Sequence, residues 1–413
     1  MIPQDVEKYT VNVLRNLISI QTINPPGLEY EKCSKYLREN LERFGFRVEL
    51  VPIPEDYLDK YYPYAPSHRG NPRYIVLGRK GSGSPVLHFN GHYDVVPAGA
   101  GWKRDPFEPV VEDGRIYGRG STDMKGGIAA VIGCFKHTTD SNLKHRGTME
   151  VAFVPDEESG GAGTRYLVDS GRTKPDYVII AEPTHPPIEG ITIGHKGMVR
   201  GIVKVFGKQV HGSTPWKGEN AFVKASQLVS EFTKDYQPLL NSRETVHPTQ
   251  DSEGKHPTIN LGGYAESLSK KDNIISGEFT FSIDRRVIPE EEVDEVAKEL
   301  QNYFQTAAQR VGARIEVRIL SAVPASVTAL NSRIVTVASK CIKSRLGLNA
   351  VPTISLGRND AVFYKKTVED VINYGPGEEH TAHTPDEYTT TTELTNCIEI
   401  YTDIIKELLT SKP

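Results

Sequence analysis

The spacing of apolar residues predicts two kinds of architecture along the chain. Near the N-terminus, Val6, Val13, Leu14 and Leu17 recur at helical spacing, and the segment 29–44 has the same period. By the same criterion, further helices are predicted at 124–137, 332–346 and 392–410. Short apolar runs predict strands at 73–78, 85–91, 148–154, 176–181 and 370–374. This alternation of strands and helices favours a three-layer α/β sheet.

The pattern changes from about residue 197. A strand, a helix, two strands, a helix and a last strand follow, at 201–206, 221–232, 258–263, 277–284, 293–304 and 313–320. This β-α-β-β-α-β order is that of the split, ferredoxin-like unit. We therefore predict an α/β domain, formed by 1–196 and 321–413, that is interrupted by an inserted α+β domain at 197–320. Residues 52–72, rich in Pro and Tyr, predict an irregular surface segment.

Composition is that of a soluble globular protein. The 413 residues are 38% hydrophobic and 25% charged, and this length favours two domains. The net charge of −4 argues against a nucleic-acid partner. Four scattered cysteines suggest a reducing compartment, the N-terminus lacks the features of a signal peptide, and no apolar stretch is long enough to span a bilayer. We expect a cytoplasmic protein with no membrane partner.

Polar residues with metal-binding side chains follow several predicted strands. Strand ends of this kind are where α/β proteins place reacting groups. These residues, together with one histidine far downstream, are His92, Asp94, Asp123, Glu157, Glu158, Glu182 and His383. Imidazole and carboxylate bind zinc-like cations, and a two-metal hydrolytic site needs about five to six protein ligands. The set suggests a two-metal site whose ligands are His92, Asp123, Glu158, Glu182 and His383.

The two remaining carboxylates suit other roles. Asp94 lies two residues after His92, and its carboxylate can accept the second ring N–H of that histidine and set its tautomer. Glu157 and Glu158 are adjacent, so their side chains point in different directions. One of them can therefore bind metal while the other faces the attacking water as a general base.

Each signal also has a structural interpretation when it is taken alone. A His-x-Asp sequence or a Glu-Glu pair is common at ordinary positions, and Asp123 suits a helix cap. The stretch Gly118–Gly127 lacks the third glycine of a dinucleotide fingerprint and the Gly-Lys-Ser/Thr of a phosphate loop. His380 competes with His383 for the last ligand position. The joint order of the residues, each at a strand end, is what favours the metal site.

Six segments carry a family resemblance. They are NGHYDVVP (90–97), YGRGSTDMKGG (117–127), PDEESGG (155–161), AEPT (181–184), VHGSTP (210–215) and HTPDE (383–387). The chain resembles the M20 metallopeptidase family, which includes succinyl-diaminopimelate desuccinylase, acetylornithine deacetylase, aminoacylase and carboxypeptidase G-type enzymes. The resemblance covers nearly the whole chain and implies a three-layer zinc-hydrolase domain with an inserted lid.

This resemblance implies which residues hold which metal. Asp123 would bridge two divalent metal ions per subunit, usually zinc and alternatively cobalt. His92 and Glu182 would complete one site, and Glu158 and His383 would complete the other. The family ligand comes directly before a Thr-Pro-x-Glu turn, and this favours His383 over His380.

The resemblance also implies the remaining roles at the metal site. Glu157 would be the general base, and Asp94 would be the carboxylate that orients the metal-binding histidine. The family places a cis peptide after the bridging aspartate, which here is the Asp123-Met124 bond.

The inserted domain would contribute to catalysis from its loops. By the resemblance, His211 reaches the active site of the partner subunit and stabilises the oxyanion, so the domain would be a lid and a homodimerisation module. Arg286 would clamp the substrate carboxylate, and Asn273 and Gly375 would line the substrate. Taken alone, His211 is an ordinary loop histidine and Arg286 is a strand-end arginine paired with Asp284.

We therefore expect a di-metal hydrolase that cleaves an amide bond next to an α-carboxylate. The overall motif pattern favours an enzyme like succinyl-diaminopimelate desuccinylase or acetylornithine deacetylase, with a metallo-carboxypeptidase or dipeptidase as the alternative. The partner would be a small N-acyl amino acid or peptide with a free carboxylate. A non-catalytic relative would be expected to lack Glu157 or a metal ligand, but this chain has all of them. A phosphatase or nuclease would need basic residues around the metals, and the sequence does not show such residues there.

Overall fold

The structure is a computed structural model that describes residues 2–410. The chain divides into two compact units. The larger unit is formed by Met1–Gly194, Thr328–Thr353 and Asn359–Pro413, and the inserted unit by His195–Val327 and Ile354–Arg358. The sequence analysis places the boundaries after residues 196 and 320 and does not assign 354–358 to the inserted unit.

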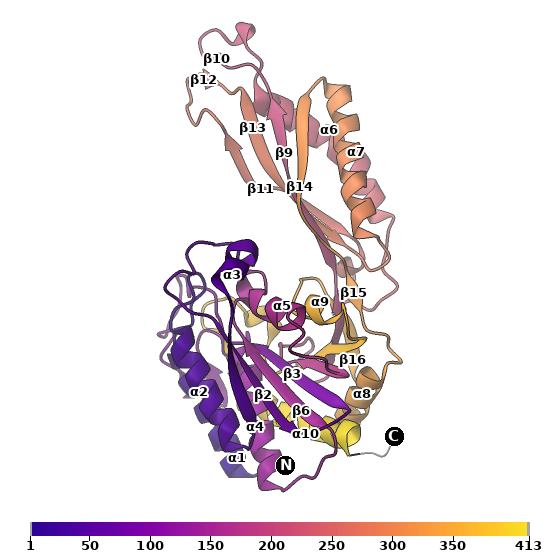
Figure 1. Cartoon of the computed structure of the whole chain (residues 1–413). Coiled ribbons are helices and arrows are strands. Elements are labelled where there is room, and N and C mark those ends of the chain that lie inside the picture. The colour runs from indigo at the N-terminus through magenta and orange to yellow at the C-terminus, as the bar shows by residue number, and fades with distance from the viewer. Residues whose placement is uncertain (1, 411–413) are drawn as a thin grey trace. The chain divides into compact units, whose positions relative to one another are not determined.

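A mixed sheet forms the centre of the larger unit (Figure 1). Its strands lie in the order β1-β2-β6-β3-β7-β17-β8, with β16 beside β8. Their bounds are Arg47–Pro52 (β1), Tyr74–Gly81 (β2), Thr148–Val154 (β6), Val86–His92 (β3), Tyr177–Ile180 (β7), Asp370–Asn373 (β17), Gly190–His195 (β8) and Val351–Ser355 (β16). The central strands β6, β3, β7 and β17 run parallel, so their carboxyl ends share one edge of the sheet.

Helices cover both faces of this sheet, and this confirms the three-layer α/β architecture. One layer contains α1 (Gln4–Ser19), α2 (Tyr30–Arg43), α4 (Lys125–Asp140), α8 (Arg333–Leu346) and α10 (Thr391–Leu409). The other layer contains α3 (Glu55–Tyr61), α5 (Ala162–Asp169) and α9 (Ala361–Tyr364). Strand β3 is buried on both faces, as its nearly continuous apolar run predicts.

A small three-stranded sheet brings distant segments together. β18 (Tyr388–Thr390) pairs with β5 (Arg115–Tyr117), which pairs with β4 (Val110–Glu112). This pairing holds the loop that follows β5 next to the loop that precedes β18.

The inserted unit has the ferredoxin-like order that the sequence predicts. Its elements are β9 (Gly197–Phe206), α6 (Ala221–Asn241), β11 (Thr258–Ser267), β13 (Glu278–Val287), α7 (Val293–Val311) and β14 (Arg314–Val323). The strands form an antiparallel sheet in the order β11-β13-β9-β14. Both helices pack on one face of it, where Phe232 of α6 and Phe304 of α7 stack with ring centroids 3.9 Å apart. A separate two-stranded pair is formed by β10 (Val210–His211), which follows β9, and β12 (Ile274–Ile275), which precedes β13.

One sequence prediction for the larger unit is wrong in part. The segment 52–72 is not wholly irregular, because it contains the short helix α3. Leu58 of this helix and Tyr62 just after it are buried against β1, β2 and α5. A two-turn helix has too few apolar positions to show a period, so only the tertiary packing reveals it. Within residues 2–410, no helix combines the length and the apolar character needed to cross a membrane.

Candidate dinuclear metal site

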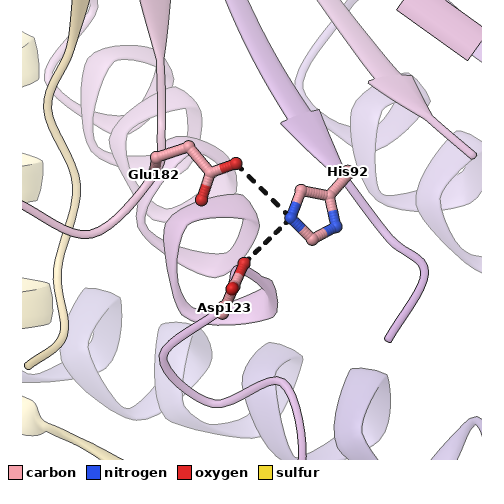
Figure 2. A group of neighbouring side chains, drawn as sticks. All are labelled: His92, Asp123 and Glu182. Carbon is pink, nitrogen blue, oxygen red and sulfur yellow. Dashed lines mark hydrogen bonds and ion pairs between the residues drawn. The ribbon is translucent and has the colours of Figure 1, made fainter. Parts of the chain in front are cut away.

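The carboxyl edge of the parallel strands holds a first group of possible metal ligands. His92 ends β3, and Glu182 comes two residues after the end of the neighbouring strand β7. His92 Nε2 lies 2.9 Å from Asp123 Oδ1 and 3.4 Å from Glu182 Oε1 (Figure 2). Two side chains from adjacent strands and one from the loop before α4 therefore converge on one point.

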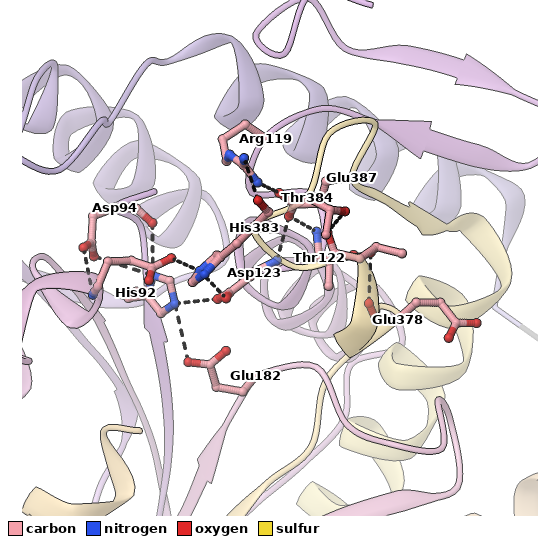
Figure 3. A network of polar contacts seen from close by, with 12 residues as sticks. His92, Asp94, Arg119, Thr122, Asp123, Glu182, Glu378, His383, Thr384 and Glu387 are labelled. Atoms are coloured by element: carbon pink, nitrogen blue, oxygen red, sulfur yellow. Dashed lines mark hydrogen bonds and ion pairs between the residues drawn. The ribbon is translucent and has the colours of Figure 1, made fainter. Parts of the chain in front are cut away.

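A second group shares Asp123 with the first. His383 Nε2 lies 3.2 Å from Asp123 Oδ2 and 3.0 Å from Glu158 Oε1 (Figure 3). Asp123 thus directs one oxygen to each group, which is the arrangement of a carboxylate that bridges two metal ions. In each group the candidate ligand atoms all lie within 4.8 Å of one another.

The electrostatics of the two groups suit divalent cations. Burial, together with the nearby Asp123 carboxylate, raises the pKa of Glu158 to about 7 and that of Glu182 to about 7. Hydrogen bonds to Asp123 and Glu158 raise the pKa of His383 to about 10. The raised pKa values of the two glutamates reflect the unfavourable burial of several carboxylates together, and bound cations would relieve this charge repulsion. The donor set, imidazole nitrogen and carboxylate oxygen, fits zinc-like metals.

The tautomer of His92 is set by a backbone group. Its Nδ1 lies 3.0 Å from the carbonyl oxygen of Asp94 and 3.5 Å from the carboxylate Oδ1 of the same residue. A carbonyl oxygen can only accept, so Nδ1 carries the hydrogen and Nε2 is left to bind metal. The sequence analysis assigns this orienting contact to the Asp94 carboxylate, whereas the closer acceptor is the Asp94 main chain.

The Asp94 carboxylate instead holds the turn that carries the two adjacent glutamates. Its Oδ1 accepts the N–H of Glu157, and its Oδ2 accepts the N–H of Glu158, each at 3.2 Å. Burial and, next, the nearby Asp360 carboxylate raise the pKa of Glu157 well above its usual range. A carboxylate with raised proton affinity beside a metal site suits a general base.

A second buried carboxylate joins the two loops that carry Asp123 and His383. Glu387 Oε1 accepts the N–H groups of Thr122 and Asp123 at 2.9 and 3.0 Å, and its Oε2 lies 2.5 Å from Arg119 Nη1. Arg119 also donates to the carbonyl oxygen of His383 at 3.4 Å. Figure 3 shows this bridge between the two loops. The peptide bond between Asp123 and Met124 is cis, as the resemblance implies.

Gly375 packs against the main chain that carries the candidate ligand Glu182. A Cβ at Gly375 would lie 2.6 Å from the Glu182 carbonyl oxygen and would collide with Ala181, and a Cβ at Gly127 would also collide with Ala181. The main chain that carries Glu182 therefore passes between two glycines.

The other predicted site residues belong to the inserted unit. His211 is exposed, and its Nδ1 lies 2.7 Å from the Ser213 hydroxyl. The β10–β12 pairing brings Asn273 next to it, because Gly212, the residue after His211, donates to the Asn273 carbonyl oxygen at 2.7 Å. Arg286 is half-buried, with its Nε 2.9 Å from Asp284 Oδ1.

Comparison with known proteins identifies the family. The model of peptidase family M20/M25/M40 matches residues 88–407. The chain belongs to this family. As a member of the M20 family, the protein is a metal-dependent amide hydrolase with small amide or peptide substrates, and the family binds dinuclear metal centres.

Three M20-type proteins illustrate the range of relatives. A probable succinyl-diaminopimelate desuccinylase of Staphylococcus aureus is 28% identical over 411 residues, covering 94% of this chain and 96% of the relative. The solved structure of a tripeptidase from Staphylococcus aureus has a TM-score of 0.77 at 22% identity and covers 100% of both chains. A dinuclear metal-binding peptidase from Bacillus subtilis has a TM-score of 0.71 at 16% identity, covering 99% of this chain and 100% of that one.

The sequence analysis missed the residues that support the glutamate turn of this M20 protein. Asn24 Nδ2 donates to Asp94 Oδ2 at 3.0 Å and to Asp156 Oδ1 at 3.1 Å. Asp156 is buried and pairs with the buried Arg73, whose Nε lies 3.2 Å from Asp156 Oδ2. Tyr30 also donates to Asp156 Oδ1 at 3.1 Å. These partners are separated by 70 residues or more from the carboxylates that they hold, so no local pattern could reveal them.

The structure separates the two competing histidines by their partners. The side chain of His380 is 70% exposed and lies 3.4 Å from Glu378, outside both ligand groups.

We expect His383→Ala to lower the zinc content from two ions to about one per subunit, because it removes one ligand of the second group. His380→Ala is the control and should keep two ions. Elemental analysis after dialysis against buffered zinc measures both, and equal metal loss in the two variants would contradict the assignment.

Proposed function

We propose that the protein is an N-acyl amino acid amidohydrolase of the succinyl-diaminopimelate desuccinylase or acetylornithine deacetylase type. The observation that carries this proposal is the pair of ligand groups that share Asp123, with Glu157 held in the adjoining turn. The Staphylococcus aureus relative that matches almost the whole chain is named as a probable succinyl-diaminopimelate desuccinylase. That name supports a substrate that carries an acyl group and a carboxylate.

The metal ligands of the proposal are those that the sequence analysis predicts. His92, Asp123 and Glu182 would hold one divalent ion, and Asp123, Glu158 and His383 would hold the other. We propose zinc as the metal, with cobalt as a substitute. When bound, the ions would polarise the scissile carbonyl and lower the pKa of the attacking water.

The chain's own residues would move the proton. Glu157 would take a proton from the attacking water and return it to the leaving amine, so that one carboxylate serves first as base and then as acid. Asp94 would keep Glu157 in place through the N–H groups of the turn. The Asp94 carbonyl would keep Nε2 of His92 directed at the metal.

The inserted unit would complete the substrate site. His211 would donate to the oxyanion, Arg286 would bind the substrate carboxylate, and Asn273 and Gly375 would line the substrate. For Arg286 this role requires the substrate to displace or join Asp284, to which the arginine is paired. The predicted domain at 197–320 would act as a lid, and a homodimer would supply His211 from the partner copy. Four buried free cysteines support a cytoplasmic location.

A metallo-carboxypeptidase or dipeptidase activity is the second candidate. It is favoured by the likeness to the solved structure of an M20 family metallo-carboxypeptidase from Sulfolobus solfataricus, which covers 96% of this chain and 98% of that chain. Both activities use the same metal ligands and the same general base, so the difference lies in the substrate pocket.

A substrate panel tests the proposal directly. Protein loaded with zinc, and separately with cobalt, is assayed for release of free amine from N-succinyl-diaminopimelate, N-acetylornithine, N-acetyllysine, aliphatic N-acyl amino acids and dipeptides. We expect turnover of an N-acyl amino acid, its loss on dialysis against a chelator, and its recovery when zinc or cobalt is added back, because the ligands hold the metals reversibly. Cleavage of dipeptides alone would favour the second candidate. Release of amine from none of them would refute both.

A further inference from the structure

Strand β3 carries a row of polar side chains through the buried centre of the larger unit. His88 and Asn90 are 0% and 1% exposed, and they alternate with the apolar Leu87 and Phe89. Because side chains alternate along a strand, His88 and Asn90 lie on the same face of β3 as His92, the metal-ligand candidate at its end. Buried polar groups are costly unless they are hydrogen-bonded, so this row requires partners.

The partners form a continuous chain of hydrogen bonds. His88 Nδ1 lies 2.7 Å from Glu150 Oε1, and His88 Nε2 lies 2.8 Å from the Tyr364 hydroxyl. Asn90 Nδ2 donates to the same hydroxyl at 2.9 Å. The chain thus runs from β6 across β3 to α9, and each of its members is buried.

The other end of the chain reaches the helix that follows the Glu157 turn. Asn90 Nδ2 also lies 3.3 Å from the Thr164 hydroxyl, and that hydroxyl donates to Asp360 Oδ2. Thr164 is in the first turn of α5, and Asp360 immediately precedes α9. A Cβ at Gly161, the residue before α5, would lie only 2.7 Å from Asp360 Oδ1, so this carboxylate packs closely against the turn.

Two carboxylates therefore hold the glutamate turn from its two ends. Asp94 accepts the N–H groups of Glu157 and Glu158 at the start of the turn. Asp360 contacts Gly161 and Thr164 at its end.

We propose that Asp360 and Thr164 are positioning residues that fix the direction of the Glu157 carboxylate relative to the metal ligand His92. The connection runs through one rigid element, because Asn90, which holds Thr164, is two residues from His92 on β3. Displacement of a general base by a fraction of an ångström lowers the rate of proton transfer without removing substrate or metal contacts. The inference rests on the proposed role of Glu157 as the base.

Thr164→Val is the sharpest test, because valine has nearly the same shape as threonine and lacks only the hydroxyl. We expect kcat to fall about 10-fold to 100-fold, as for other residues that orient catalytic groups, while KM changes less than about threefold and two metal ions are retained. Thr164→Ser should restore most of the rate, since serine keeps the hydroxyl. The matched control is Thr402→Val, because Thr402 is equally buried in the same unit but hydrogen-bonds only within α10 and to Cys134.

Hydrogen exchange gives a readout that does not depend on turnover. In Thr164→Val, amides of the segment 155–163 should exchange faster than in the wild type, and in Thr402→Val they should exchange at the wild-type rate. If Thr164→Val does not fold, Tyr364→Phe breaks the same chain one step further away, with Tyr401→Phe as its control. Both substitutions remove a single buried hydroxyl from a tyrosine.

The outcomes separate this inference from the proposed function. If Thr164→Val has unchanged kcat and unchanged hydrogen exchange, the positioning role is overturned. The proposed function is still supported in that case, provided that the wild type is active. Loss of metal, or an equal fall of kcat in Thr402→Val, would also overturn it. If the wild type hydrolyses none of the panel, the proposed function fails, and the exchange rate of segment 155–163 alone decides whether the chain holds the turn.

Discussion

Glu157→Gln is expected to lower kcat by about 10²-fold to 10⁴-fold, the usual contribution of a general acid–base residue. Glutamine has the shape of glutamate but cannot accept the proton of the attacking water. Glu157 lies in neither ligand group, so the variant should retain two metal ions per subunit. Its main-chain N–H, which donates to Asp94, is also retained, so the turn should keep its conformation.

Steady-state kinetics on the best substrate of the panel, together with elemental analysis, measure this result. Glu393→Gln is the matched control, because Glu393 is a buried carboxylate of the same unit that completes the capping box at the start of α10. It should leave both kcat and the midpoint of thermal unfolding near the wild-type values, since the glutamine side-chain oxygen can still accept the Thr390 N–H of the capping box. A Glu157→Gln variant with near wild-type turnover would exclude Glu157 as the base.

Asp123→Asn is expected to lower the metal content of the protein below one ion per subunit and to abolish activity. The reason is that Asp123 is the shared member of both ligand groups, with Oδ1 near His92 and Oδ2 near His383. An amide offers one oxygen and one NH₂ group, so it cannot bind two cations. Glu182→Gln, by contrast, changes the first group only and should retain the second ion.

Zinc titration of the chelator-treated protein by calorimetry separates these cases. Asp176→Asn makes the same chemical change at the opposite end of β3, where Asp176 Oδ2 accepts the N–H of Val86 at 2.7 Å. This control should bind two ions with wild-type affinity. Binding of two ions with unchanged affinity by Asp123→Asn would show that the two groups do not share a bridging carboxylate.

The candidate ligands could be predicted from the sequence because of where they stand in it. His92 ends the apolar strand β3, Glu158 and Glu182 come shortly after the ends of β6 and β7, and parallel strands end at a common edge. The choice of His383 over His380 depended on the family motif, and the structure gives the two histidines different surroundings. Hydrogen bonds of Glu387 and Arg119 connect the loop that carries His383 to the loop that carries Asp123. His380, by contrast, lies next to Glu378.

The residues that orient the site could not be predicted in this way. Asn24 and Arg73 reach Asp156 from 132 and 83 residues away, and Thr164 reaches Asp360 from 196 residues away. Which polar side chains meet across such distances depends on the order of strands in the sheet. That order places β3 between β6 and β7, an arrangement that local spacing does not encode.

The sequence by itself therefore determined the two architectures, the ligand candidates and the general-base candidate. Hydrophobic periodicity and strand-end chemistry are local properties, and they are visible wherever an element is long enough to show its period. Only the tertiary structure decided that Asp123 faces both ligand groups, that the Asp94 main chain sets the His92 tautomer, and that Asp94 and Asp360 hold the glutamate turn from its two ends. These contacts depend on which distant segments pack together, and they form only when the whole sheet and its covering helices are in place.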